Sequence, residues 1–132
     1  MDFSALVLME RDSATGHLIK EEGSYAVNEG AVYVSKLYLQ DGTVNLFFTT
    51  GRDVEDWEYS AIFDLFDTEV FEKLGYNIEE IDSEFNPVWK VTFEYDEDHE
   101  ETRAVLNELC TIIKENIEKV FEDIKGKESD YE

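Results

Sequence analysis

The chain has 132 residues, of which 42% are hydrophobic and 14% aromatic, and its 33 acidic and 11 basic residues give a formal net charge of -22. The hydrophobic content is too high for a disordered acidic chain, and the length suits one domain. Phosphate backbones and anionic membrane surfaces would repel so negative a chain, which argues against direct nucleic-acid binding and against membrane association.

Charge and cysteine content also indicate the protein's surroundings. Net charge far from zero keeps a protein soluble and attracts cations and basic proteins. Cys110 is the single cysteine, so the sequence allows no intrachain disulfide. The apolar run near the N-terminus is short and has no basic segment before it, and no apolar stretch is long enough to span a bilayer. We therefore expect a soluble cytoplasmic protein whose charged partner, if it has one, is a basic protein.

Added salt or millimolar divalent cation is expected to raise the thermal stability, because screening weakens the repulsion among the acidic side chains. Melting temperatures at low and moderate ionic strength check this prediction. A melting temperature that does not move with salt would contradict it.

The predicted elements begin with β-strands. Residues 3–9 carry apolar side chains on both faces, which is typical of a central strand, and residues 17–22 are expected to return beside them after a turn. Two further β-rich runs, residues 31–40 and 43–50, flank the pair Asp41-Gly42. This pair indicates a β-hairpin, because both positions of the tightest hairpin turn need positive φ.

The segment 57–66 allows two interpretations. As a strand it places Trp57, Tyr59 and Ala61 on one face, and as a helix it places Trp57, Ala61 and Leu65 on one side. Its aromatic content and its period of two favour the strand.

A short helix around 68–74, closed by Gly75, comes next and leads into an acidic connection. Pro87 then opens a strand over 88–95, where a missing backbone N–H is tolerated.

From about residue 98 to 125 the hydrophobic period changes to that of a helix. One stripe at the 3, 4 and 7 spacings comprises Leu106, Leu109, Cys110, Ile113, Ile117, Val120, Phe121 and Ile124. The sequence therefore predicts an α+β fold: a mostly antiparallel sheet of about five to six strands, with the long C-terminal helix packed on one face. We expect a single domain over residues 1–126, which ends at Gly126, and a frayed acidic tail over 127–132.

The length of this helix exceeds that of a typical strand. A helix of about 27 residues spans roughly 40 Å, and a strand about 20 Å. Val105 and Ile112 also lie off the main stripe. A tilted crossing of the sheet explains the length, and so does contact with a second chain, so a homodimer is one of two interpretations.

The stretch EYDEDHEETR, residues 94–103, looks at first like a metal site. A zinc-peptidase helix that begins at His99-Glu100 would need its second ligand at position 103, which is Arg103. A calcium loop that begins at Asp96 would need glycine at its sixth position, where Glu101 stands. Both motifs fail. Asp98 as N-cap, with Glu101 three residues later, predicts the start of a helix instead.

No other catalytic scheme is supported by the sequence. His99 and Cys110 are roughly 16 Å apart along one helix and cannot share a metal ion. Cys110 lies on the apolar stripe, as expected of a small buried side chain. The seven glycines are scattered and form no phosphate-binding loop. We predict no enzyme activity, no catalytic residue, no metal and no cofactor.

The loop GRDVEDWEY, residues 51–59, is the one candidate for binding a partner. It surrounds a tryptophan with charged side chains, namely Arg52, Asp53, Glu55, Asp56, Trp57 and Glu58. An exposed tryptophan ringed by acids would anchor a basic partner. The alternative is that Trp57 turns inward and that the acids form a solvated rim.

Three functions remain open. The first is a non-catalytic protein-interaction or structural module. The second is a nucleic-acid mimic that occupies the groove of a basic protein, which requires the acids to cluster on one surface. The third is a small-ligand binder or enzyme with a pocket between helix and sheet, lined by tyrosines: Tyr25, Tyr33, Tyr38, Tyr59 and Tyr95.

Overall fold

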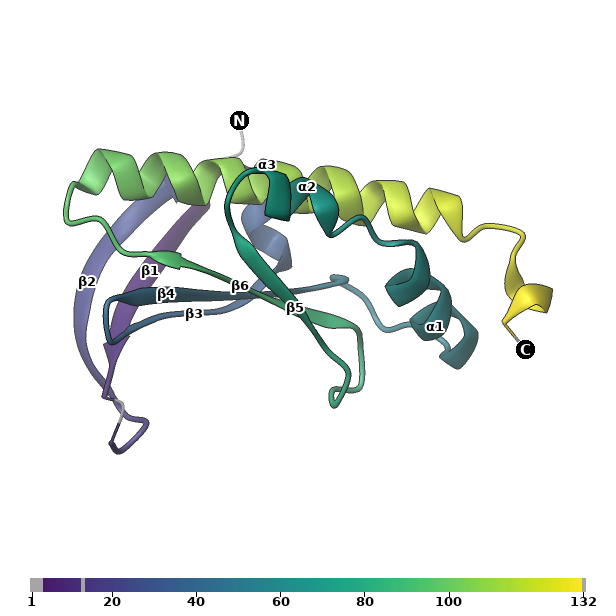
Figure 1. Cartoon of the computed structure of the whole chain (residues 1–132), viewed down its shortest axis with the longest axis horizontal. Coiled ribbons are helices and arrows are strands. Elements are labelled where there is room, and N and C mark those ends of the chain that lie inside the picture. Colours follow the sequence, from purple (N-terminus) through teal and green to yellow (C-terminus); the bar gives the residue numbers. More distant parts are fainter. Residues whose placement is uncertain (1–3, 13, 132) are drawn as a thin grey trace.

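The computed structural model describes residues 4–12 and 14–131 and has the predicted α+β architecture (Figure 1). Phe3, Ser13 and Glu132, which belong to the predicted first strand, turn and tail, lie outside the described residues. The strands are β1 (Ser4–Arg11), β2 (Leu18–Val27), β3 (Val34–Gln40), β4 (Thr43–Thr49), β5 (Asn77–Ile81) and β6 (Val88–Glu94). The helices are α1 (Asp56–Leu65), α2 (Glu69–Lys73) and α3 (His99–Asp123), with 3-10 turns η1 (Glu29–Tyr33) and η2 (Glu128–Asp130).

The six strands form one sheet in the order β2-β1-β3-β4-β6-β5. β1 lies between β2 and β3, so the prediction of a central strand is confirmed. Its pairing with β3 is parallel, with Met9 opposite Tyr38, and the other pairings are antiparallel. The sheet is therefore mostly antiparallel, as predicted.

The hairpin at Asp41-Gly42 is also confirmed. It joins β3 to β4, and its two residues have φ of 52° and 79°. Positive φ at both central positions gives the turn a twist that matches the twist of the paired strands. This turn fixes the register between β3 and β4, and therefore which side chains share a face.

The preferred interpretation of 57–66 as a strand is wrong, because this segment forms α1. Its two adjacent residues Ala61 and Ile62 are both fully buried, which a strand with one solvated face does not allow. Glu55 and Glu58 form a capping box at the start of the helix. Capping and burial against the core therefore override the β propensity of the aromatic side chains.

Two shorter segments also differ from expectation. The connection after the short helix contains the edge strand β5, which pairs with β6. Its consecutive acids Glu79 and Glu80 hide the alternation, and charged residues are common on sheet edges. At the other end of the chain, residues 31–33 belong to η1, so β3 begins later than predicted.

All three helices lie on one side of the sheet or beyond the ends of its strands, and α3 crosses the sheet at a tilt (Figure 1). The side chains that face α3 form the core, and its aromatic centre is Phe48 of β4, stacked on Trp89 of β6 at 5.1 Å between ring centroids. Ile112 is buried in this core, and Val105 packs against it. The chain itself therefore accounts for both residues, and neither requires contact with a second chain.

Beyond Gly126, the chain turns back toward α1. The turn η2 brings Tyr131 onto this helix, where its hydroxyl donates to Asp64 Oδ2 at 2.6 Å. Tyr131 also packs against the core. These contacts involve residues that we predicted to form a frayed tail.

Candidate functional site

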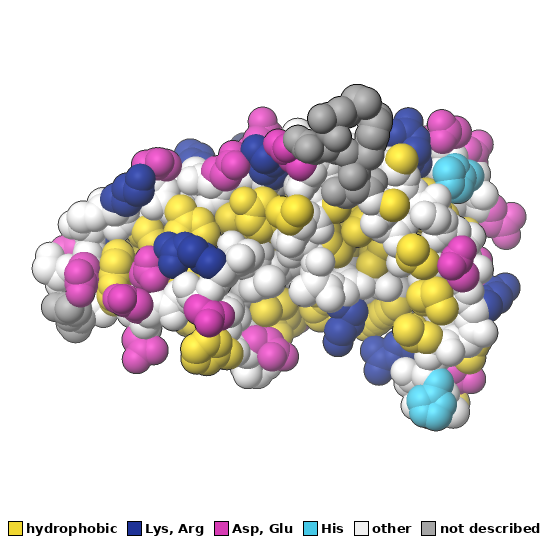
Figure 2. All heavy atoms as spheres, turned by 180° about the vertical axis from the view of Figure 1, so that it is seen from behind, with side chains coloured by type: hydrophobic (Ala, Val, Ile, Leu, Met, Phe, Trp, Pro, Cys, Tyr) yellow, Lys and Arg dark blue, Asp and Glu magenta, His cyan; other side chains and the backbone are white. Residues whose placement is uncertain are grey.

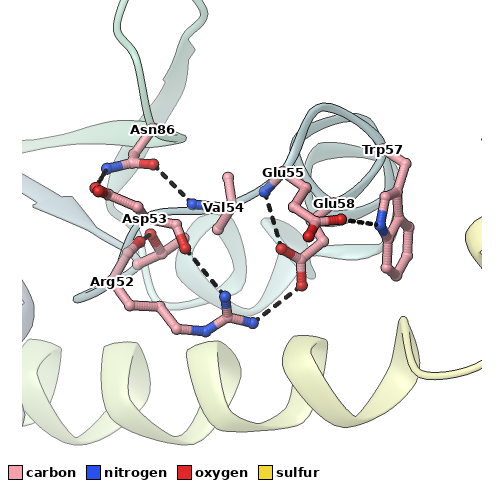
Figure 3. Close-up of polar contacts among 8 residues, drawn as sticks. Arg52, Asp53, Val54, Glu55, Trp57, Glu58 and Asn86 are labelled. Carbon is pink, nitrogen blue, oxygen red and sulfur yellow. Dashed lines mark hydrogen bonds and ion pairs between the residues drawn. The ribbon is translucent and has the colours of Figure 1, made fainter.

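The six residues predicted to bind a partner lie together at the start of α1 (Figure 3). The guanidinium of Arg52 pairs with Glu58 at 3.0 Å. The other oxygen of Glu58 accepts from the backbone N–H of Glu55, and the indole N–H of Trp57 donates to Glu55 at 3.0 Å. Hydrogen bonding to Arg52 lowers the pKa of Glu58. These acids therefore interact mainly with their own loop and helix.

The rest of this loop is held by neighbouring segments. Asn86, in the turn between β5 and β6, donates to Asp53 at 2.9 Å and accepts from the backbone N–H of Val54 at 3.1 Å (Figure 3). The Arg52 guanidinium lies 4.2 Å from the ring centroid of Phe121 on α3. Trp57 is half-buried and packs against the core, and Asp56 is exposed. The residues thus form a helix cap that joins α1 to α3, and partner binding by them stays a prediction.

The acidic stretch 94–103 starts α3, as its capping pattern predicted. The side chain of Asp98 accepts from the backbone N–H groups of Glu100 and Glu101. His99 stacks on Tyr25 of β2 at 4.6 Å between ring centroids, and its Nε2 lies 3.0 Å from the carbonyl oxygen of Ser24. Within residues 4–12 and 14–131, no three His, Cys, Asp or Glu side chains are grouped so that they could hold a metal ion.

Cys110 is buried on α3, and burial raises the pKa of its thiol to about 11. In the unfolded chain the pKa of a thiol is near 8.5. Between pH 8.5 and 11 the thiol is therefore deprotonated in the unfolded state but still protonated in the folded state, so rising pH favours unfolding. The free energy of unfolding should therefore fall by up to about 3 kcal/mol between pH 8.5 and 11. Chemical denaturation over this pH range measures the fall.

Cys110→Ala is the control for the thiol prediction. Burial also raises the pKa of Tyr25, to about 12, so the variant should keep some alkaline sensitivity. A variant with the same pH dependence as the parent chain would show that the thiol does not contribute.

The five tyrosines proposed to line one pocket do not all lie on the same face of the sheet. Tyr25 faces α3 and stacks on His99, whereas Tyr38 stacks on Phe47, which lies on the opposite face of the sheet. Side chains on opposite faces cannot line one cavity. The five tyrosines therefore cannot all line one pocket between helix and sheet, and a ligand pocket there stays a hypothesis.

A different set of side chains gathers on the sheet face that points away from α3. In β4 and β6, Phe48 and Trp89 face the helix, so their neighbours Phe47 and Lys90 face outward and lie opposite each other. Lys36 of β3 pairs with Phe47 from the other side. No helix covers this face in the described part of the chain. We call the following residues the basic–aromatic face: Arg11, Lys36, Tyr38, Phe47 and Lys90.

The cationic groups of this face lie against its rings. The Nζ atoms of Lys36 and Lys90 are 5.1 Å and 5.9 Å from the ring centroid of Phe47, and the Arg11 guanidinium is 4.9 Å from that of Tyr38. The two rings are stacked with centroids 6.1 Å apart. The result is a surface that is apolar beneath and positively charged on top.

Two shallow hollows adjoin this face, and Lys36 contributes to both. The larger hollow has a volume of about 380 Å³. Besides Lys36, it is lined by four apolar residues, Phe47, Ile81, Phe85 and Val88, and by four polar ones, Ser35, Thr49, Glu84 and Asn86. The smaller, of about 300 Å³, is lined by Arg11, Gly16, Leu18, Lys36, Leu37 and Tyr38. Phe85, at the edge of the larger hollow, is 77% exposed. The face therefore offers a partner both apolar and cationic contacts.

Sequence reasoning missed this face. The alternation of β6 placed Trp89 and Lys90 on opposite sides, which was a usable signal. The gathering of Arg11, Lys36 and Lys90 depends on the strand order, in which the parallel pairing of β1 with β3 brings Arg11 beside Tyr38. No sequence pattern revealed that pairing.

Residues 1–132 match a protein family described as a family of unknown function, DUF6762. No curated protein and no solved structure matches the chain. Among the described residues, no helix is both long and apolar enough to cross a membrane.

Proposed function

Because the chain belongs to the DUF6762 family, whose function is unknown, we propose a function from its own surface: it is a non-catalytic module that binds another protein through the basic–aromatic face. The observation that carries this proposal is the uncovered sheet face, where aromatic rings and basic groups lie among the polar side chains usual on a solvated face. Aromatic residues and arginine are also enriched where proteins bind one another.

The surroundings of this face support protein binding. Phe85 and Leu18, at the margins of the two hollows, are 77% and 58% exposed. Each of these side chains adds exposed apolar area to the hollow that it borders, and contiguous apolar area marks interaction surfaces. The hollows are shallow and lie side by side on a broad face, a shape that suits a protein surface or segment better than an enclosed small molecule.

The acidic surface supports a separate and weaker expectation. Its charge would attract a basic protein, as the sequence predicts. On the side of the molecule shown in Figure 2, acidic side chains lie mainly around the margins, among lysines and arginines, and hydrophobic side chains occupy much of the middle. On this side of the molecule (Figure 2) the acids are not gathered as a nucleic-acid mimic would require.

Site-specific photocrosslinking in the native cell tests the proposal. A photoreactive phenylalanine analogue at position 85 reports on the basic–aromatic face, and the same analogue in place of Glu115, exposed on α3, is the matched control. We expect a discrete protein adduct from position 85 that position 115 does not give. The adduct, identified by mass spectrometry, should bind the purified chain and lose affinity for its Phe47→Ala variant. Equal adducts from both positions, or none, would contradict the proposal.

A further inference from the structure

Two of the three bases of the basic–aromatic face, Arg11 and Lys36, differ from most bases of the chain because they have no ion pair among the described residues. Ion pairs within 4.0 Å join the majority of the bases to acids, namely Lys20, Arg52, Lys90, Arg103, Lys114, Lys119 and Lys125. Among the described residues, no carboxylate lies within that distance of Arg11 or Lys36, and the pair between Lys90 and Glu79 is at the 4.0 Å limit. In a chain with three acids for every base, this face has cations left to offer a partner.

We propose, on the basis of the proposed function, that the partner contributes an acidic segment with an apolar anchor. Its carboxylates pair with Arg11, Lys36 and Lys90. Its apolar side chain enters the larger hollow, between Phe47 and Phe85. The partner therefore has the opposite charge to the basic protein that the net charge predicts.

The net charge of the chain does not prevent this pairing. At physiological ionic strength the Debye length is about 8 Å, so exposed acids farther from the face are largely screened. A carboxylate in contact with Lys36 interacts at a much shorter distance, on an apolar floor that excludes water. Local charge therefore decides the pairing, and it comprises the bases Arg11, Lys36 and Lys90 together with the two adjacent acids Glu79 and Glu84. The distant acids mainly slow the approach at low salt.

Two other occupants fit the face less well. Stacking rings and bases on a sheet also bind single-stranded nucleic acid, but this binding needs a continuous basic track along the backbone. Here Glu79 lies beside Lys90 and Glu84 lines the larger hollow. A second copy would bring two chains of net charge -22 together, and a two-fold contact would place the same basic face on both sides.

A random-peptide display library, selected on the intact protein, tests the inference. We expect recovered peptides to combine Asp or Glu with a large apolar side chain. Their affinity should fall about tenfold for the double variant Lys36→Met and Lys90→Met, because two partly desolvated charge pairs are lost while the side-chain stems remain. The matched control is Lys73→Met with Lys125→Met, which removes the same charge from α2 and from the residues just after α3 and should leave the affinity unchanged.

The outcomes separate the inference from the proposed function. Peptides that lose affinity for Phe85→Ala but carry no acids would contradict the inference that the partner is acidic. So would peptides that bind the Lys36→Met and Lys90→Met variant as tightly as the parent chain. Either result would leave the proposed binding face in place. Peptides that bind but respond to none of the variants on the face would contradict both proposals. Binding of single-stranded oligouridylate more tightly than the selected peptides would assign the face to nucleic acid instead. A dimer in sedimentation that these lysine substitutions dissociate would assign it to a second copy of the chain.

Discussion

Replacing Gly30 by alanine is expected to lower the free energy of unfolding by about 3 kcal/mol, and the melting temperature by roughly 10 °C. Gly30 is buried in η1, directly against α3. A Cβ atom at this position would lie 2.0 Å from the carbonyl oxygen of Cys110 and 2.6 Å from its carbon. Both are backbone atoms of a packed helix, so no side-chain rotation relieves the overlap, and η1 must move away from α3.

The same displacement would disturb a polar cluster between η1 and α3. Asn28 accepts from the backbone N–H of Gly30 at 2.8 Å. Its side-chain amide also donates to the carbonyl oxygen of Asn107 at 3.0 Å and to the hydroxyl of Thr111 at 2.7 Å. A partly buried group that loses such partners costs about 1–3 kcal/mol. The substitution therefore combines overpacking with lost hydrogen bonds.

Two controls identify the cause of this loss. In Gly75→Ala the added Cβ has no heavy atom within 4 Å, so this variant tests only the effect of a side chain at positive φ, here 92°. It should lower the free energy of unfolding by about 1–2 kcal/mol. Adding Cys110→Ala to Gly30→Ala should not restore stability, because the overlap is with the backbone. Thermal denaturation of the four proteins makes the comparison, and a stable Gly30→Ala variant would show that η1 does not pack on α3 in this way.

Sequence reasoning succeeded where one local signal determined the structure. Asp41-Gly42 predicted its hairpin because few other residues tolerate two consecutive positive φ values. Asp98 predicted the start of α3, and the periodicity after it predicted the buried stripe. In each case the relevant contacts lie within a few residues of one another along the chain.

It failed where contacts distant in sequence decided the structure. The segment 57–66 satisfies both periodicities, and its packing under α3 with the Arg52 cap determines that it is helical. In the same loop, the pairing of Glu58 with Arg52 and of Asp53 with Asn86 is known only from the fold, and partner binding by the loop stays a prediction. The basic–aromatic face depends on strand order, and its local signal, the alternation of β6, places Lys90 alone and not the bases beside it.

Replacing Phe48 by alanine is expected to lower the free energy of unfolding by about 3–5 kcal/mol, whereas replacing its neighbour Phe47 should cost about 1 kcal/mol. Phe48 is fully buried and stacks on Trp89, Phe71 and Phe66 at centroid distances of 5.1 Å, 5.8 Å and 5.9 Å. Its removal leaves a cavity in the aromatic centre of the core. Phe47 faces outward and is only partly buried, so its removal costs mainly its contacts with Tyr38 and the lysine stems.

The comparison of these neighbours tests which face of the sheet is structural and which binds a partner. Chemical denaturation should separate the two variants by at least about 2 kcal/mol, and the peptides selected on the parent chain should lose affinity only for Phe47→Ala. Equal destabilisation by both substitutions would mean that Phe47 is covered in solution, and the face could then not be open to a partner. A stable Phe47→Ala variant with unchanged peptide affinity would leave the fold as described and place the binding surface elsewhere. Successive side chains of β4 point to opposite faces of the sheet, and α3 covers only one of these faces. Phe48 therefore packs in the core, and its neighbour Phe47 is placed to contact a partner.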